Sequence, residues 1–171
     1  MAELMDFQSW ELPACRLAGK ERILSPFEAD PLPEFWEHCD KDGVFFAWEA
    51  DPDALFPEAL CDAADAPLCW CGNLQPDGAF HCLIGRMLHP GANVPEGLDF
   101  RDLPACKTVL GRIKGNVPDV FAEAMDLILS ETEKLGLVPD TFSMEVRVPS
   151  RFSVPDPKDG SVILDYYIQV R

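Results

Sequence analysis

The chain is poor in basic residues. Among its 171 residues, 14 are lysine or arginine and 30 are aspartate or glutamate, which gives a formal net charge of −16. The imbalance is strongest in residues 1–91, with five basic and seventeen acidic residues, against nine and thirteen in residues 92–171. Such a surface repels phosphate backbones, so direct nucleic-acid binding is not expected. It attracts cations, either small molecules or a basic protein partner, unless the acids serve only solubility.

Long apolar runs are also missing. No stretch approaches the ~20 apolar residues of a membrane span. The first residues, MAELMDFQSWELP, carry acids where a secretory signal peptide has a basic start. We therefore expect a soluble, cytoplasmic protein with no membrane association. An apolar content of 47% is enough for a single domain, residues 1–171, with its own core.

Common catalytic and metal-binding motifs are absent as well. The sequence has no G-x-S-x-G, no phosphate-binding glycine loop and no H-E-x-x-H. Its seven cysteines are odd in number and lie mostly in apolar runs, which favours buried, reduced thiols over a disulfide framework. Cys69 and Cys71, together with His81 and Cys82, could be drawn as a metal site. However, C-x-x-C spacing is missing, and we expect the Cys-x-Cys thiols to point to opposite faces of a strand. No metal and no cofactor are therefore predicted.

The sequence does contain a short internal repeat. The segment ELPACR at residues 11–16 returns as DLPACK at 102–107. Each copy lies in a predicted strand that is followed by a helix and two more strands. We interpret this order as a tandem duplication, with repeats at about 5–90 and 98–171, rather than the chance recurrence of a short motif. The predicted strands are 7–24 (interrupted at Pro13 and Gly19), 66–73, 78–88, 98–115, 141–150 and 161–171.

Two segments carry the pattern of amphipathic helices. The first begins at Pro31, with Asp30 as its cap, and ends before Gly43. The second begins at Pro118 and ends at Gly136. The expected buried faces are Leu32, Phe35, Trp36 and Cys39 in the first helix, and Val120, Ala124, Leu127, Ile128 and Leu135 in the second. Segment 44–66 mixes aromatic, acidic and proline residues, and we expect a loop with a short helix.

These elements predict an α+β fold. Each β-α-β-β module is too small to bury both faces of its sheet, so we expect two modules to pair with pseudo-twofold symmetry. The predicted sheets are antiparallel, carry helices on one face and leave a central groove between the modules. Grooves of this kind are where small ligands bind.

The alternation of the last two strands indicates which residues face that groove. Val146 belongs to an apolar set in residues 143–148, and Ile168 to one in residues 162–170, and both sets should face the helix. Glu145 and Tyr167 then share the opposite face. A carboxylate among aromatic rings can bind a cation or act as a general base. The alternatives are that Glu145 only pairs with Arg147 and that Tyr167 is an ordinary strand residue.

Four further residues are candidates for ligand contacts. Trp70 lies on the first predicted hairpin, and His81 and Leu83 share one face of its second strand. Trp48 belongs to an aromatic group in segment 44–66 that could act as a lid. For both tryptophans the alternative is ordinary packing in the core.

In order along the chain, these segments resemble the GyrI-like small-molecule-binding family. This is the effector-binding domain that is also fused to AraC-type and MerR-type multidrug transcription regulators. The resemblance covers nearly the whole chain and rests on LPACRLAGKERI, EFWEHC, CLIGRML, LPACKTVLGRIKG and SMEVRV with LDYYIQV. Residues that match family positions are Trp36, Glu145, Asp165, Tyr167, Ile168 and Val170, while Ile84-Gly85-Arg86 matches imperfectly and Gln169 replaces a proline.

The resemblance implies a stand-alone effector- or drug-binding protein for a lipophilic, often cationic small molecule. Such a protein would act in sensing, sequestration or toxin resistance, with Glu145 at the base of the groove. Some relatives are similar to hydrolases of strained electrophiles, so a hydrolase that uses Glu145 and Tyr167 is the second hypothesis. The third is an acidic inhibitor of a DNA-handling enzyme. Segment 44–66 has no counterpart in the family pattern.

Overall fold

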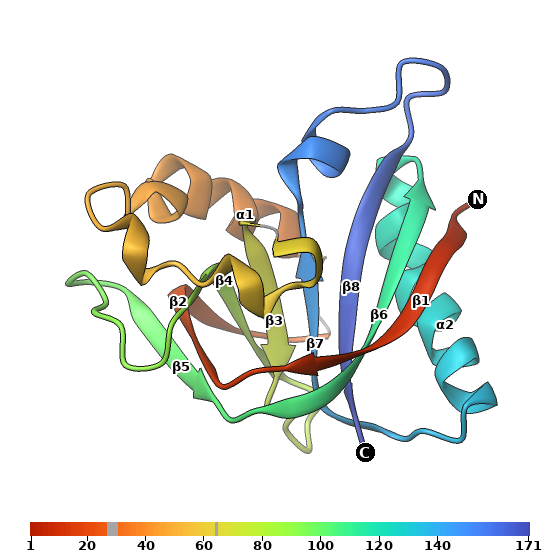
Figure 1. Ribbon diagram of the computed structural model, residues 1–171, viewed down its shortest axis with the longest axis horizontal. Helices are drawn as coiled ribbons and strands as arrows, with labels where there is room; N and C mark the ends of the chain where they lie inside the picture. Colours follow the sequence, from red (N-terminus) through yellow and green to blue (C-terminus); the bar gives the residue numbers. More distant parts are fainter. Residues whose placement is uncertain (27–30, 64) are drawn as a thin grey trace. The chain divides into compact units, whose positions relative to one another are not determined.

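The structure is a computed structural model that describes residues 1–26, 31–63 and 65–171 (Figure 1). The chain divides into two compact units. Unit 1 comprises residues 1–12 and 106–171, and unit 2 comprises residues 13–105. Each unit is described by itself below. Within the described residues, neither helix combines the length and the apolar composition that a membrane span requires.

Unit 1 is an antiparallel sheet with the strand order β1-β6-β8-β7 and one long helix on its face (Figure 1). The elements are β1 (Glu3–Leu12), β6 (Cys106–Gly115), α2 (Val117–Lys134), β7 (Pro139–Val146), the π-helical turn Pro149–Ser153 and β8 (Val162–Val170). The predicted helix is confirmed, with Pro118 in its first turn and Gly136 at a φ of 68° just after it.

The core of unit 1 lies between α2 and the sheet. Val120, Ala124 and Ile128 of the helix are buried against apolar residues of β6 and β8. Leu127 is partly buried in the same cluster, as expected. Leu135 is 58% exposed instead, because it lies at the C-terminal cap, beyond the last turn that faces the sheet.

Unit 2 is also an antiparallel sheet, with the order β3-β4-β2-β5 and the helix α1. Its elements are β2 (Cys15–Leu24), α1 (Leu32–Lys41), β3 (Leu68–Gly72), β4 (Phe80–Leu88) and β5 (Asp99–Leu103). Pro31 caps α1, and the expected cap Asp30 lies outside the described residues. In place of one short helix, residues 44–63 form the four 3-10 turns Val44–Phe46, Pro52–Ala54, Pro57–Ala59 and Cys61–Ala63.

The buried face of α1 agrees with its sequence pattern. Phe35, Trp36 and Cys39 are buried, and Leu32 is partly buried in the same cluster. This cluster also contains Cys69, Cys82 and Ile84 of the sheet. Successive side chains of a strand point to opposite faces. The residues of β3 and β4 at even spacing from Cys69, Cys82 or Ile84 therefore face α1, and the residues between them point away from it.

The two LPAC copies are the places where the chain leaves one unit and enters the other. Leu12 ends β1 and Cys15 begins β2, while Leu103 ends β5 and Cys106 begins β6. Each predicted long strand is thus two strands, since proline has no N–H for a ladder. Register pairs Leu12 with Cys106 in unit 1 and Cys15 with Leu103 in unit 2.

Each unit therefore combines strand, helix, strand and strand from one proposed repeat with one strand from the other. The units share this order, and the duplication itself remains an interpretation.

Gly19 does not interrupt β2, contrary to expectation. It lies directly opposite Gly85 of β4 inside a continuous ladder. A Cβ on Gly19 would lie 1.9 Å from the carbonyl oxygen of Ile84, so the two backbones approach too closely for any side chain. This glycine marks a close approach between strands rather than the end of a strand.

Candidate functional site

The last two strands do not place Glu145 and Tyr167 on one face of their sheet. In the antiparallel register, Glu145 lies opposite Tyr166, and Met144 lies opposite Tyr167. Directly opposed residues share a face, and the Tyr166 hydroxyl donates to Ser143 Oγ at 3.2 Å, as this assignment requires. Glu145 is therefore on the face that carries α2, and Tyr167 is on the other. The predicted shared face is wrong.

The error arises in β7, because both of its faces are buried in the half of the strand that contains Glu145. Met144 and Val146 are 0% and 1% exposed, and Glu145 is only 7% exposed. The prediction assumed that one face of the strand is apolar and packs against the helix, while the other face is exposed to water. That premise fails here. In β8 the rule holds, since Leu164 and Ile168 share a cluster with Ile128 of α2.

Glu145 forms an ion pair with Arg147, which follows the end of β7. Arg147 Nη2 donates to Glu145 Oε1 at 3.0 Å. The Arg147 guanidinium also lies over the rings of Phe121 and Phe152, with its Cζ 4.8 Å and 5.2 Å from their centroids. The structure thus shows the alternative given in the sequence analysis, in which Glu145 pairs with Arg147 and the guanidinium compensates its charge.

Tyr167 lies beside a second compensated acid on the face away from α2. Asp165 is 1% exposed, and Arg151 donates to it from Nε at 2.8 Å and from Nη2. Arg112 Nε donates to the same carboxylate at 3.5 Å. Tyr167 is itself 1% exposed. Two guanidiniums already satisfy Asp165, so this carboxylate has little charge left for a ligand cation.

In unit 2, the predicted ligand contacts of the first hairpin do lie together. Trp70 of β3 is directly opposite Leu83 of β4, and His81 follows Leu83 on the same face at a spacing of two residues. Glu21 of β2 is opposite Leu83 from the other side. All of these side chains point away from α1, because Cys82 and Ile84 point toward it.

Arg101 of β5 joins three of these residues, and we call Glu21, Trp70, His81 and Arg101 the Arg101 cluster. Arg101 donates to Glu21 through Nε and through Nη2, the latter at 3.1 Å. His81 Nδ1 lies 3.2 Å from Glu21 Oε2 and 3.2 Å from Arg101 Nη2. The Arg101 Cζ lies 4.5 Å from the centroid of the Trp70 ring. A guanidinium is thus held by a carboxylate and an aromatic face.

The side chains of the Arg101 cluster are half-buried, and the pKa of Glu21 is shifted by its neighbours. The side chains of Glu21, His81 and Arg101 are 23%, 18% and 28% exposed. Burial acts to raise the pKa of the Glu21 carboxyl, but hydrogen bonds with Arg101 and His81 outweigh it and hold that pKa below its ordinary value. Glu21 is therefore an anion at neutral pH.

Sequence reasoning missed Glu21 and Arg101. They are 80 residues apart, and only the pairing of β5 with β2 brings them together. The available signal was the alternation of β2, which places Glu21 and Leu17 on one face.

Trp48 does not line the Arg101 cluster. It is 3% exposed and packs with Ala18, Ala54 and Leu88, and its Nε1 donates to the carbonyl of Asn93 at 3.4 Å. Ala18 of β2 and Leu88 of β4 belong to the alternate residues whose side chains face α1. The structure therefore shows core packing for Trp48, on the face opposite Trp70, and the lid interpretation has no support.

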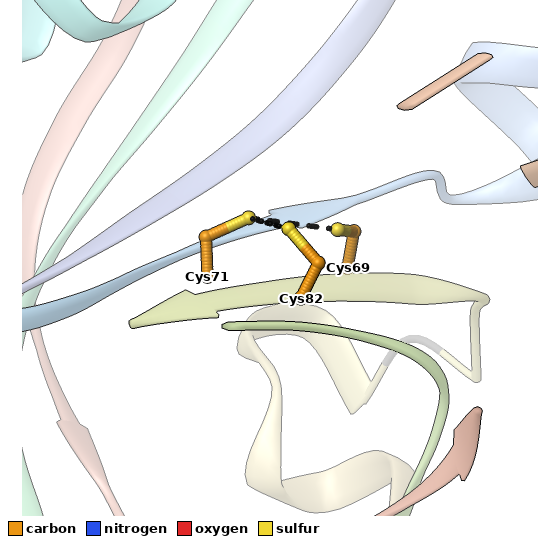
Figure 2. A group of neighbouring side chains, drawn as sticks. All are labelled: Cys69, Cys71 and Cys82. Atoms are coloured by element: carbon orange, nitrogen blue, oxygen red, sulfur yellow. Dashed lines mark hydrogen bonds between the residues drawn. The ribbon is translucent and has the colours of Figure 1, made fainter. Parts of the chain in front are cut away.

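Three cysteines gather on the α1 face of unit 2, and we call Cys69, Cys71 and Cys82 the thiol cluster (Figure 2). Cys71 and Cys82 are directly opposed in register, with their Sγ atoms 2.9 Å apart. Cys69 Sγ lies 3.7 Å from Cys71 Sγ. The expectation that Cys-x-Cys thiols diverge is wrong, because residues two apart in a strand share a face.

No protein-family model and no curated protein sequence matches the chain. Among solved structures, the chain is similar to SAV2435 bound to tetraphenylphosphonium, with 17% identity, a TM-score of 0.67 and coverage of 98% of this chain and 94% of that one. It is also similar to the EcmrR C-terminal domain, with 15% identity, a TM-score of 0.61 and coverage of 97% of both chains. A hydrolase from Listeria innocua matches with 10% identity, a TM-score of 0.58 and coverage of 97% of this chain and 92% of that one.

These likenesses concern the fold. Over nearly its whole length the chain has the α+β fold of GyrI-like effector-binding domains, which confirms the fold expected from the resemblance.

Proposed function

We propose that this chain binds lipophilic cations as an effector- or drug-binding protein, and that the Arg101 cluster recognises the positive charge. The observation that carries this proposal is the Arg101 guanidinium, which pairs with Glu21 while it lies over the Trp70 ring. A carboxylate and an indole face are the groups by which proteins hold organic cations. The cluster already holds a cation of its own.

A ligand cation would take the place of Arg101. Arg101 belongs to β5, the last strand in the order of unit 2, and its side chain is 28% exposed. A long side chain of this kind can turn toward solvent while its stem stays in place. Leu83 lies directly opposite Trp70 and is fully buried, so a ligand would contact it only after Arg101 has moved. The class of ligand is supported by SAV2435, which has the same fold and has been solved with tetraphenylphosphonium.

The matched variants Glu21→Gln and Glu145→Gln test this site. Both remove one negative charge at nearly constant size, but Glu21 belongs to the Arg101 cluster and Glu145 pairs with Arg147 on the α2 face of unit 1. Tetraphenylphosphonium binding is measured by calorimetry, and rhodamine-type dye binding by fluorescence. We expect Glu21→Gln to cost about 1–3 kcal/mol of affinity, with little change for Glu145→Gln. Equal affinities for wild type and Glu21→Gln would refute the site.

Tyr167 remains a candidate ligand contact on the face of unit 1 away from α2. Tyr167→Phe keeps the ring and removes the hydroxyl, so a loss of dye affinity in this variant would assign the hydroxyl a role in binding. The biological setting, whether sensing, sequestration or toxin resistance, depends on the ligand. Native mass spectrometry of the purified protein would identify a ligand that it carries.

The hydrolase hypothesis relied on Glu145 and Tyr167 acting on one substrate. Their positions on opposite faces of the sheet remove that pair, so we place binding before turnover. A basic protein partner remains a hypothesis based on charge alone, and its capture should weaken steeply with added salt.

A further inference from the structure

The thiol cluster has the geometry of a metal site. Its three Sγ atoms all lie within 4.8 Å of one another. Thiolates bound to one tetrahedral metal ion at about 2.3 Å are separated by about 3.8 Å. The observed separations of 2.9 Å and 3.7 Å reach that value with small side-chain movements. Figure 2 shows the three sulfur atoms directed toward one another from β3 and β4.

We infer that Cys69, Cys71 and Cys82 form a binding site for one soft divalent metal ion, held by three thiolates. Thiolate ligands select soft, thiophilic ions over hard ions such as Mg²⁺ or Ca²⁺. Among the described residues, no further histidine, cysteine or carboxylate belongs to the group. The fourth coordination position is therefore left for water or an exogenous ligand.

The backbone around the cluster is well suited to hold a metal ion. The three cysteines lie on two paired strands, and the turn that joins these strands is closed by a hydrogen bond from Gln75 N to the Ala79 carbonyl at 2.7 Å. Ligands on strands are placed more rigidly than ligands on loops. Cys71 is only partly buried and gives an ion access to the otherwise buried thiols.

Charge in the neighbourhood favours a divalent ion. Three thiolates and a divalent ion carry a net charge of −1. Arg22 lies directly opposite Cys82 in the ladder, so its side chain shares the face of the cluster. Its guanidinium lies over the Phe35 ring, with Cζ 4.5 Å from the centroid. This fixed positive charge offsets the excess negative charge of the loaded site.

Cysteine binds a metal ion as the thiolate. Metal binding must therefore displace protons, and its affinity should increase with pH.

Cd(II) is the probe for this site. Reduced protein, desalted under anaerobic conditions, is titrated with Cd(II) while thiolate-to-metal absorption in the ultraviolet and proton release are recorded. We expect one Cd(II) per chain with high affinity. Cys71→Ser and Cys82→Ser should lose the absorption band, whereas Cys39→Ser and Cys106→Ser should keep it. Cys39 is the closest control, because it is buried in the same core cluster but outside the group of three.

Two results would overturn the inference. One is that the thiolate-to-metal absorption band does not appear in the wild type, or that it is equally strong in Cys71→Ser. The other is a wild type that binds no Cd(II) when reduced but forms a Cys71–Cys82 disulfide in air, which would make the pair a redox couple. Cys71 is partly exposed, so Cys71→Ser decides the test even if substitution of the buried Cys82 prevents folding. The thiol cluster and the Arg101 cluster lie on opposite faces of the sheet of unit 2. Dye binding and Cd(II) binding can therefore be lost independently of each other.

Discussion

The Arg101 guanidinium covers the ring of Trp70, with Cζ 4.5 Å from the ring centroid, and at the same time pairs with Glu21. Recognition of a cation is thus already built into one face of unit 2. An external cation and Arg101 would compete for the same carboxylate and the same ring, and this competition can be measured.

Removing Arg101 should strengthen the binding of lipophilic cations. Arg101→Leu removes the guanidinium from the Trp70 ring and from Glu21, which keeps its contact with His81, so we expect the affinity for tetraphenylphosphonium to rise by roughly 1 kcal/mol or more. Arg16→Leu is the matched control. Arg16 also pairs with an acid, Asp102, and also lies over a ring, Phe100, but it is on the α1 face.

Both variants lose one positive charge. An equal rise in the two would indicate a general effect of net charge and would count against a specific site at Arg101.

Acid should weaken both the Arg101 cluster and the binding of cations. The Glu21 pKa lies below its ordinary value of 4.5 in the folded chain, because hydrogen bonds with Arg101 and His81 outweigh burial. A lowered folded-state pKa adds stability that is complete above the unfolded value and disappears as the pH falls through the folded value. Urea unfolding at stepped pH, from about 6 to about 3, should show a steeper loss for wild type than for Glu21→Gln. Parallel curves would contradict this assignment.

Gly19 should tolerate no side chain. A Cβ would lie 1.9 Å from the Ile84 carbonyl oxygen, and neither backbone can move without breaking the ladder. We expect Gly19→Ala to lower the free energy of unfolding by roughly 1–3 kcal/mol or more in urea denaturation.

Gly111→Ala serves as the comparison, because its Cβ would meet side-chain atoms of Ile128 and Leu4 that can shift. We expect a smaller loss for this variant. A larger loss for Gly111→Ala than for Gly19→Ala would show that the contact between backbones is not the limiting one.

Local elements were predictable because local rules govern them. Pro118 and Gly136 mark the ends of α2, and the periodic apolar residues of α1 and α2 are buried or partly buried as expected, except Leu135 at the end of α2. The same rules failed where packing on both sides decides the outcome. In β7 both the apolar set and Glu145 are buried, so alternation alone could not assign the face of Glu145.

The amino-acid sequence by itself determined the helices, the hairpin of β3 and β4, and the acidic character of the chain, because these depend on residues that are close in sequence or on composition. Only the tertiary structure decided which charges meet. Glu21 and Arg101 are distant in sequence, and the antiparallel pairing of β5 with β2 places them on one face. The same holds for Cys71 and Cys82, whose strand register brings two thiols from separate strands into contact. Register between strands depends on the packing of whole sheets, and no short segment encodes it.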